Sequence, residues 1–498
     1  MSPTLWMSVW WACTGTVSPA LGETDPASET DETAETADSG DAGETADSGG
    51  DTSDTEDTSD TSDTSDTGDT SDTNDTDVDC ANLATFDEGI QPTSTLHVAT
   101  NGNDDTGNGS SGQPFASLVR AIQEATPGTA IQLHPGTYSG GLWIENLSGT
   151  AQAPIWIGGD PSGARPVIQG GAEAMHLVAS SYLVIHDLEV RNTSDNGINA
   201  DDGGDYDNPQ ASHGLVFRNL YIHGVGSSGN EDCLKLSGVN EFAVLDSEFT
   251  DCGGEYASAV DMVGCHDGVV ANNQFHDLAG IAVQAKGGSS SIDITRNGFL
   301  NAGVRALNLG GSTDLEYFRP PVSTSQPNAE ARDLRVHANV FVYGDAPIAF
   351  VGCVGCLVAN NTIVDPNQWV IRILQETTSS GNVEFEPTGN NRFVNNVVWY
   401  NAATLSTHVN VGDDTAPATF DFAYNLWYAH DNPATSEPDL PNSENNALYG
   451  QDPDFGADWT IGGGSPAAGA GTAIGTLGAD FSGSCWGNPP SMGAYEAN

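Results

Sequence analysis

The chain has 498 residues and a formal net charge of −56, with 69 acidic residues against 13 basic ones. This charge excludes a surface of clustered lysines and arginines for binding phosphates, so no nucleic-acid partner is expected. The 59 glycines and the 37% share of hydrophobic residues fit a folded part with many tight turns around a sizeable core.

Residues 1–22 form a short apolar run followed by small residues, which is typical of an export signal, although it lacks basic residues at its start. Cys13 within it is a candidate for lipidation. No other segment approaches the ~20 apolar residues of a membrane span. We therefore expect a protein that is secreted or held at the cell surface, with a lipid anchor at Cys13 as its only route to the membrane.

Residues 23–80 are predicted to be a disordered acidic stalk. The first 80 residues contain 22 acidic residues and no basic ones, and the segment repeats Asp, Thr and Ser. Such a composition buries too little apolar surface to fold, and its like charges keep it extended. An acidic calcium-binding segment is the alternative interpretation.

Residues 92–430 are predicted to form a single-stranded right-handed parallel β-helix, a pectin-lyase-like solenoid. Within 233–311, short alternating strands turn at glycine, and Phe249, Phe275 and Phe299 recur at spacings of 26 and 24 residues. A fixed period of this length indicates stacked repeats. An amphipathic helix over 115–125 is expected to cap the first rung. We expect a stacked ladder of asparagines at positions 219, 272, 297, 339, 360 and 395.

Several short segments carry a family resemblance. V-A-T-N-G-N-D, P-F-A-S-L and G-T-Y between residues 98 and 138 resemble the N-terminal cap of secreted bacterial right-handed β-helix proteins, a group that includes pectate-lyase-like and other polysaccharide lyases. S-P-A-A-G-A-G and G-A-Y-E are similar to the closing segment of surface β-helix proteins, which assigns residues 431–498 to a C-terminal closing segment.

The eight cysteines suit an exported protein that forms disulfides. Cys80 and Cys485 are a plausible clamp between the ends of the fold. Cys353 and Cys356 are expected to form a local disulfide or to be buried thiols, and zinc is not expected because no second pair accompanies them. With Cys13 set aside, seven cysteines remain, so at least one is unpaired.

The scarce basic residues are the candidates for chemistry. Strand alternation places five side chains outward from the first strand of successive or nearby rungs, and Arg305 and Arg319 close by. The five are Lys235, Asp261, Lys286, Asn308 and Arg372, and they include both lysines of the chain. They could also be ordinary surface ion pairs worth less than ~1 kcal/mol each.

The resemblance implies a polysaccharide lyase that cleaves an acidic polysaccharide by β-elimination. It assigns catalysis to Lys286, as the base, and to Arg305. Lys235, Asn308, Arg319 and Arg372 would bind substrate, and Asp232 and Asp261 would bind Ca²⁺. The sequence departs from lyase patterns, since it lacks the N-x-x-R and R-H-G segments of known lyases.

Two alternatives stay open. A glycoside hydrolase of the same fold would use a carboxylate pair drawn from Asp201, Asp202, Asp232 and Asp261. A non-catalytic adhesin would bind sugars, with aromatic residues for stacking. The candidate aromatic residues are Trp369, Trp399, Trp427 and Tyr400. In each case the site is expected beside long loops at 201–212, 317–332 and near 377–390, and the protein is expected to be a monomer.

Overall fold

A computed structural model describes residues 80–226, 229–475 and 477–497. The predictions for the export signal, for Cys13 and for the acidic stalk up to residue 79 lie outside the described residues. The described part forms one compact unit. No helix in it is long and apolar enough to cross a bilayer.

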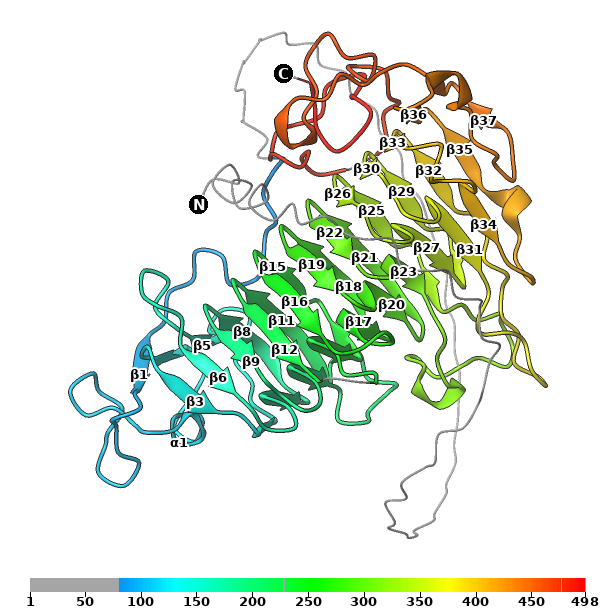
Figure 1. The fold of residues 1–498 in the computed structure, drawn as a ribbon. Coiled ribbons are helices and arrows are strands. Elements are labelled where there is room, and N and C mark those ends of the chain that lie inside the picture. The colour runs from blue at the N-terminus through cyan, green and yellow to red at the C-terminus, as the bar shows by residue number, and fades with distance from the viewer. Residues whose placement is uncertain (1–79, 227–228, 476, 498) are drawn as a thin grey trace, which may run out of the picture. The chain divides into compact units, whose positions relative to one another are not determined.

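The strands form three sheets whose ladders are all parallel, stacked along the chain as Figure 1 shows. Each complete turn of the chain adds one rung, which contributes to the first sheet (10 strands), then to the second (16 strands) and then to the third (12 strands). This is the predicted β-helix solenoid. We call the first sheet, which has 10 strands, the groove sheet.

The strands and helices have the following bounds. The groove sheet contains β4 (Leu142–Glu145), β7 (Met175–Val178), β10 (Ile198–Asp201), β13 (Leu234–Ser237), β17 (Ser258–Val263), β20 (Ile281–Lys286), β23 (Arg305–Gly310), β27 (Ile348–Val351), β31 (Ile371–Leu374) and β34 (Val409–Val411). The 16-stranded sheet contains β1 (Ser94–Val98), β2 (Thr129–Leu133), β5 (Ile155–Gly158), β8 (Ser181–His186), β11 (Ser212–Arg218), β14 (Val239–Asn240), β15 (Ala243–Leu245), β18 (His266–Ala271), β21 (Ser289–Thr295), β24 (Ala331–Arg332), β25 (Arg335–His337), β28 (Cys353–Val354), β29 (Leu357–Ala359), β32 (Arg392–Val394), β35 (Asp421–Ala423) and β37 (Glu444–Asn445). The 12-stranded sheet contains β3 (Thr137–Ser139), β6 (Val167–Gln169), β9 (Glu189–Arg191), β12 (Tyr221–Val225), β16 (Glu248–Cys252), β19 (Gln274–Leu278), β22 (Gly298–Ala302), β26 (Val340–Val342), β30 (Thr362–Val364), β33 (Val397–Tyr400), β36 (Leu426–Ala429) and β38 (Leu448–Tyr449). The helices are α1 (Leu118–Ile122) and the short 3₁₀ segments η3 (Leu315–Tyr317), η4 (Pro417–Thr419), η5 (Pro433–Thr435) and η6 (Ala457–Trp459).

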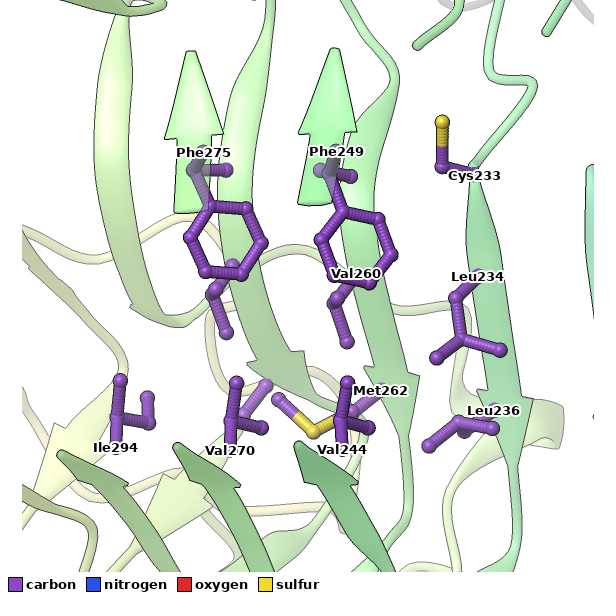
Figure 2. Packing of buried hydrophobic residues seen from close by; sticks show 14 of the residues in the cluster. Cys233, Leu234, Leu236, Val244, Phe249, Val260, Met262, Val270, Phe275 and Ile294 are labelled. Carbon is purple, nitrogen blue, oxygen red and sulfur yellow. The ribbon is translucent and has the colours of Figure 1, made fainter. Parts of the chain in front are cut away.

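The core lies inside the coil because alternate side chains of each strand point inward. Leu234, Leu236 and Met262 of the groove sheet lie there with residues of the other sheets, as Figure 2 shows. The predicted phenylalanine repeat is confirmed, since Phe249, Phe275 and Phe299 stack with centroids 5.1 and 5.0 Å apart. Parallel pairing in register places equivalent residues of successive rungs directly above one another.

The asparagine ladder exists, but only part of its predicted membership is right. Buried side-chain amides of Asn273, Asn297, Asn339, Asn361, Asn396 and Asn425 bond from rung to rung. The predicted Asn219, Asn272, Asn360 and Asn395 lie outside it and have positive φ angles. At Asn272-Asn273, Asn360-Asn361 and Asn395-Asn396, the first residue takes the left-handed turn and the second joins the ladder.

The helix expected over 115–125 is shorter than predicted. It is α1, five residues long, and Ser117 caps it by accepting a hydrogen bond from the Arg120 backbone N–H. Phe115 cannot belong to it, because its backbone forms a parallel bridge with Val98. Leu118 and Ala121 are buried in the core.

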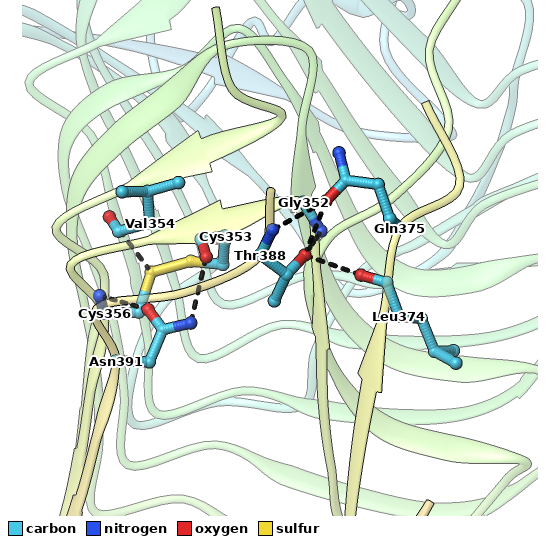
Figure 3. The surroundings of a disulfide bond; sticks show 8 residues. All are labelled: Gly352, Cys353, Val354, Cys356, Leu374, Gln375, Thr388 and Asn391. Carbon is cyan, nitrogen blue, oxygen red and sulfur yellow. Dashed lines mark hydrogen bonds between the residues drawn. A yellow bond between two sulfur atoms is a disulfide. The ribbon is translucent and has the colours of Figure 1, made fainter. Parts of the chain in front are cut away.

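Three disulfides form among the described cysteines. Cys80–Cys485 and the local Cys353–Cys356 bond are as predicted, the third joins Cys233 to Cys252, and Cys265 is a buried free thiol. Figure 3 shows the local bond beside Asn391, whose side chain bonds to the backbone of Cys353 and Cys356. Asn391 thus holds the end of the third long loop against this turn.

The three long loops all follow strands of the groove sheet and lead into the 16-stranded sheet, after β10, β23 and β31. The second and third loops pack together through Phe318, Val383 and Phe385. The fold therefore gathers its longest loops along one edge of the groove sheet, as predicted for a binding site.

Candidate functional site

A groove of about 770 Å³ lies on the outer face of the groove sheet, across the strands from β4 to β20. Both lysines and Arg319 line it, together with aromatic residues and carboxylates. Its walls include parts of the first and second long loops. Its charged and aromatic lining residues are Trp143, Glu145, Asp201, Asp202, Tyr206, Lys235, Lys286, Asp314, Tyr317 and Arg319.

Strand register explains how the predicted residues come together. One outward row runs across successive strands through Trp143, His176, Asn199, Lys235, Asp261, Gln284, Asn308, Ala349, Arg372 and Asn410. Lys286 pairs with Val263 and belongs to the next outward row, two residues further along its strand. Lys235, Lys286 and Arg372 therefore share one face of one sheet.

Lys235 is bound by two buried carboxylates. Its Nζ lies 2.8 Å from Asp232 Oδ2 and 2.8 Å from Asp261 Oδ2. The Ser258 backbone N–H and the Gln284 amide donate to the other two carboxylate oxygens. Burial favours the neutral amine, but the two carboxylates outweigh it and raise the pKa of Lys235 above its ordinary value. Lys235 is therefore a fixed ammonium.

The pKa values of the two aspartates of this triad are shifted in opposite directions. Burial and the nearby charge of Asp261 raise the pKa of Asp232 above its ordinary value. Burial acts in the same direction on Asp261, but the charges of Lys235 and Lys286 overcome it and lower the pKa of that carboxyl. Asp261 is thus the ionised partner of Lys235.

Lys286 occupies a different environment on the same face. It ends β20 and lines the groove, and in the described part of the chain no carboxylate lies within ion-pair distance of its ammonium. Lys286 is therefore available to a bound molecule, whereas the ammonium of Lys235 is held by the protein.

Arg319 joins the walls of the groove. Its Nε and Nη2 donate to Asp202 Oδ2 and Oδ1 at 2.6 and 3.3 Å, and its Nη1 donates to the Tyr317 carbonyl. Its guanidinium lies over the Tyr206 ring, 4.1 Å from the centroid. The side chain packs over Gly264, where a Cβ atom would approach Arg319 Cβ within 2.5 Å. The structure thus shows Arg319 holding the loops together.

The other predicted arginines lie beyond the groove on the same sheet. Arg305 bonds to Asn308 Oδ1 at 3.0 Å and to Glu376 Oε1 at 2.9 Å. Asn308 is buried and donates to Gln284. Arg372 lies over the ring of Trp369, 4.4 Å from its centroid. The structure does not bring these three predicted residues into the groove with Lys286.

The aromatic residues named from the sequence do not line the groove either. Trp427 and Tyr400 are fully buried in the core. Trp399 stacks on His430 at the 12-stranded sheet, with centroids 3.8 Å apart. The exposed aromatic residues of the groove are instead Trp143 and Tyr317.

Sequence reasoning missed a charged cluster at the β4–β7 end of the groove. His176 Nδ1 lies 2.8 Å from Glu173 Oε2, and its Nε2 lies 2.6 Å from Asp201 Oδ2. Burial disfavours the charged ring, but the two carboxylates raise the pKa of His176 to about 9. The signal was present in the alternation of L-W-I-E and M-H-L-V, which places Trp143 and His176 in the same outward row.

The contacts of Asp232 and Asp261 do not suit calcium. Both carboxylates already bind the Lys235 ammonium, so a divalent cation there would face a fixed positive charge. Among the residues that the structure describes, no group of three or more His, Cys, Asp and Glu side chains is arranged to hold a metal ion. No step of a reaction is assigned to calcium.

Comparisons with known proteins agree with this architecture. Residues 96–231 match the model of the Pel9A-like right-handed β-helix region, and residues 173–319 match that of the right-handed β-helix region. The crystal structure of pectate lyase Pel9A superposes with a TM-score of 0.53 at 19% identity, over 82% of this chain and 98% of that one. The chain is therefore a right-handed parallel β-helix protein. At this identity the likeness to Pel9A shows the fold of the β-helix protein.

Weaker similarities link the β-helix protein to other solved structures. A GH136 lacto-N-biosidase from Eubacterium ramulus matches with a TM-score of 0.44 at 15% identity, over 72% of this chain and 68% of that one. An alginate lyase from Paenibacillus sp. matches with a TM-score of 0.40 at 14% identity, over 65% of this chain and 97% of that one. No curated protein matches the sequence.

Proposed function

We propose that the β-helix protein is exported and binds a polysaccharide in the groove. The groove combines exposed aromatic rings of Trp143 and Tyr317 with charged and polar side chains, the mixture that binding sites use to hold and orient a ligand. The three disulfides support an oxidising compartment outside the cytosol. An anchor at Cys13 belongs to the same proposal and is tested by lipid labelling of wild type and Cys13→Ser.

Within this function, we propose cleavage of an acidic polysaccharide by β-elimination, with Lys286 as the base. One observation carries the assignment: of the cations that line the groove, Lys235 and Arg319 are held by carboxylates, and Lys286 is not. A base must reach the proton of a bound sugar, and a side chain already held by the protein is poorly placed for that.

The reaction assigns a definite path to each proton and electron pair. Neutral Lys286 Nζ takes the proton α to the uronate carboxylate, and the electrons of that C–H bond form the new C=C bond. The bond to the glycosidic oxygen at the β position breaks, and that oxygen takes a proton from water. Positive charge near the uronate stabilises the enolate-like intermediate. Lys235 lies in the adjacent row of the same face, but Asp232 and Asp261 offset its charge.

Hydrolysis is the second candidate, because the groove also contains carboxylates. Glu145, Asp201 and Asp314 line it. Paired carboxylates are what a glycosidase requires, one as acid and one as base or nucleophile. Asp232 and Asp261 are less suited to this role because they are buried and bound to Lys235. Asp202 is held by Arg319.

The deciding experiment measures products from a panel of pectins, alginates, glycosaminoglycans and neutral glycans. β-Elimination gives a new unsaturated end that absorbs ultraviolet light, together with one reducing end. Hydrolysis gives the reducing end alone. Binding without either product, measured by calorimetry, would replace the enzymatic proposal with the adhesin interpretation. Absence of both binding and products would overturn the carbohydrate assignment.

A further inference from the structure

An exposed aromatic ring is held in place at the β4–β7 end of the groove. Trp143 is 63% exposed. Its ring lies 4.4 Å from the ring of His176, centroid to centroid, and its Nε1–H donates to Glu145 Oε2 at 3.4 Å. An indole fixed on one side and exposed on the other offers a flat apolar surface to a ligand. The apolar face of a sugar ring suits such a surface.

The net negative charge at the β4–β7 end of the groove repels the carboxylate of a uronate. His176 is the only cation of its cluster, and it lies between the carboxylates of Glu173 and Asp201. Glu145 adds a further negative charge beside Trp143. Even with His176 protonated, the three carboxylates leave this end with a net negative charge. A sugar without a carboxylate avoids the repulsion, and the carboxylates can accept hydrogen bonds from its hydroxyls.

The cations of the lining lie elsewhere in the groove. Lys235 is on β13, Lys286 is on β20, and Arg319 is in the loop after β23. From β4 to β20 there are five steps between paired strands, at about 4.8 Å each, or about 24 Å in all. The two ends of the groove therefore meet different sugar residues of one bound chain.

We infer that the groove selects a heteropolysaccharide, with a neutral sugar stacked on Trp143 at the β4–β7 end and a uronate at the β20 end beside Lys286. Trp143 is a substrate-binding residue and takes no part in bond cleavage. The inference rests on the proposed carbohydrate function and deepens it, because it excludes a uronate homopolymer as the preferred substrate.

The test compares two kinds of polymer and two kinds of variant. Polygalacturonate and polymannuronate are uronate homopolymers, whereas rhamnogalacturonan I and hyaluronan alternate a uronate with a sugar that carries no carboxylate. We expect wild type to have a higher kcat/KM on an alternating polymer than on either homopolymer. Trp143→Ala should raise KM on that polymer by up to about tenfold with little change in kcat, and Trp143→Phe should restore most of the loss.

Tyr343→Ala is the matched control, because Tyr343 is also an exposed aromatic residue and does not line the groove. It should leave KM unchanged. Cleavage of an alternating polymer with an unchanged KM in Trp143→Ala would overturn the subsite and leave the proposed function intact. A preference for the homopolymers would also overturn it. If wild type neither cleaves nor, by calorimetry, binds any of the four polymers or any other glycan of the panel above, the proposed function itself fails.

Discussion

Asp202 and Arg319 are 117 residues apart in the sequence, yet they form a buried ion pair with two contacts, at 2.6 and 3.3 Å. The pair joins the loop after β10 to the loop after β23, so one interaction holds two walls of the groove. Removing either charge leaves the other buried without a charged partner.

We therefore expect Arg319→Met to lower the free energy of unfolding by about 3–5 kcal/mol, measured by urea denaturation. The double variant Asp202→Asn/Arg319→Met should lose less than the sum of the two single variants. The control is Arg335→Met, because its pair with Asp293 is more exposed and should contribute less than about 1 kcal/mol. Equal losses in Arg319→Met and Arg335→Met would contradict the role of the buried pair.

The two lysines should differ in their effects on stability. Lys235→Met leaves Asp232 and Asp261 buried together without their cation, and we expect a loss of about 3–5 kcal/mol. Lys286→Met removes the same residue type from the same face, but no ion pair, and should change stability by less than about 1 kcal/mol. Chemical denaturation gives the free energy of unfolding of both variants. A similar loss of stability in the two would argue against a stabilising role for the contacts of Lys235 with Asp232 and Asp261.

Formation of the unsaturated product should depend on Lys286. Lys286→Ala should abolish formation of the unsaturated end, and its Tm should stay within a few degrees of wild type, since the side chain holds no carboxylate. Arg392→Ala removes an exposed cation of the 16-stranded sheet and serves as the control. Unchanged product formation in Lys286→Ala would exclude Lys286 as the base.

His176 predicts a pH dependence of stability. Its pKa is raised from 6.5 to about 9 in the folded protein, so its contribution is fully present below pH 6.5 and is lost as the pH rises through about 9. We expect wild type to exceed His176→Gln by roughly 3 kcal/mol near pH 6 and by little above about pH 9. Urea denaturation of both proteins across this range gives the difference. A constant difference would show that the imidazolium contributes nothing.

Calcium binding at Asp232 and Asp261 is a prediction from the sequence, and the contacts of these two carboxylates argue against it. Because Asp232 and Asp261 already bind the Lys235 ammonium, we expect removal of calcium with EGTA to leave Tm and product formation unchanged. Magnesium added in place of calcium should have no effect either. A fall in Tm with EGTA that calcium alone reverses would establish a calcium site.

The sequence predicts the scaffold better than the site. The period of Phe249, Phe275 and Phe299 determines the rung, and strand alternation then fixes which face each lysine occupies. The row that a side chain joins is harder to predict than the face of the sheet on which it lies. A loop or bulge between strands shifts the pairing register by an amount that no local sequence pattern shows. Lys286 and Lys235 thus share a face but lie in adjacent rows.

Contacts between distant loops were beyond sequence reasoning. Arg319 looks like a free cation in the sequence, and only the folded chain brings Asp202 to it. The His176 cluster is hard to predict for a different reason, because it precedes the regular repeats that begin at residue 233, although the same alternation runs through β4 and β7.

The Cys80–Cys485 disulfide joins residues separated by 405 positions, which span nearly the whole described chain. A protease that cuts the backbone once anywhere between them leaves two fragments that are still covalently attached. Separation on a gel then requires a reducing agent as well as the cut. The β-helix protein therefore keeps its pieces together after a single nick between these two cysteines.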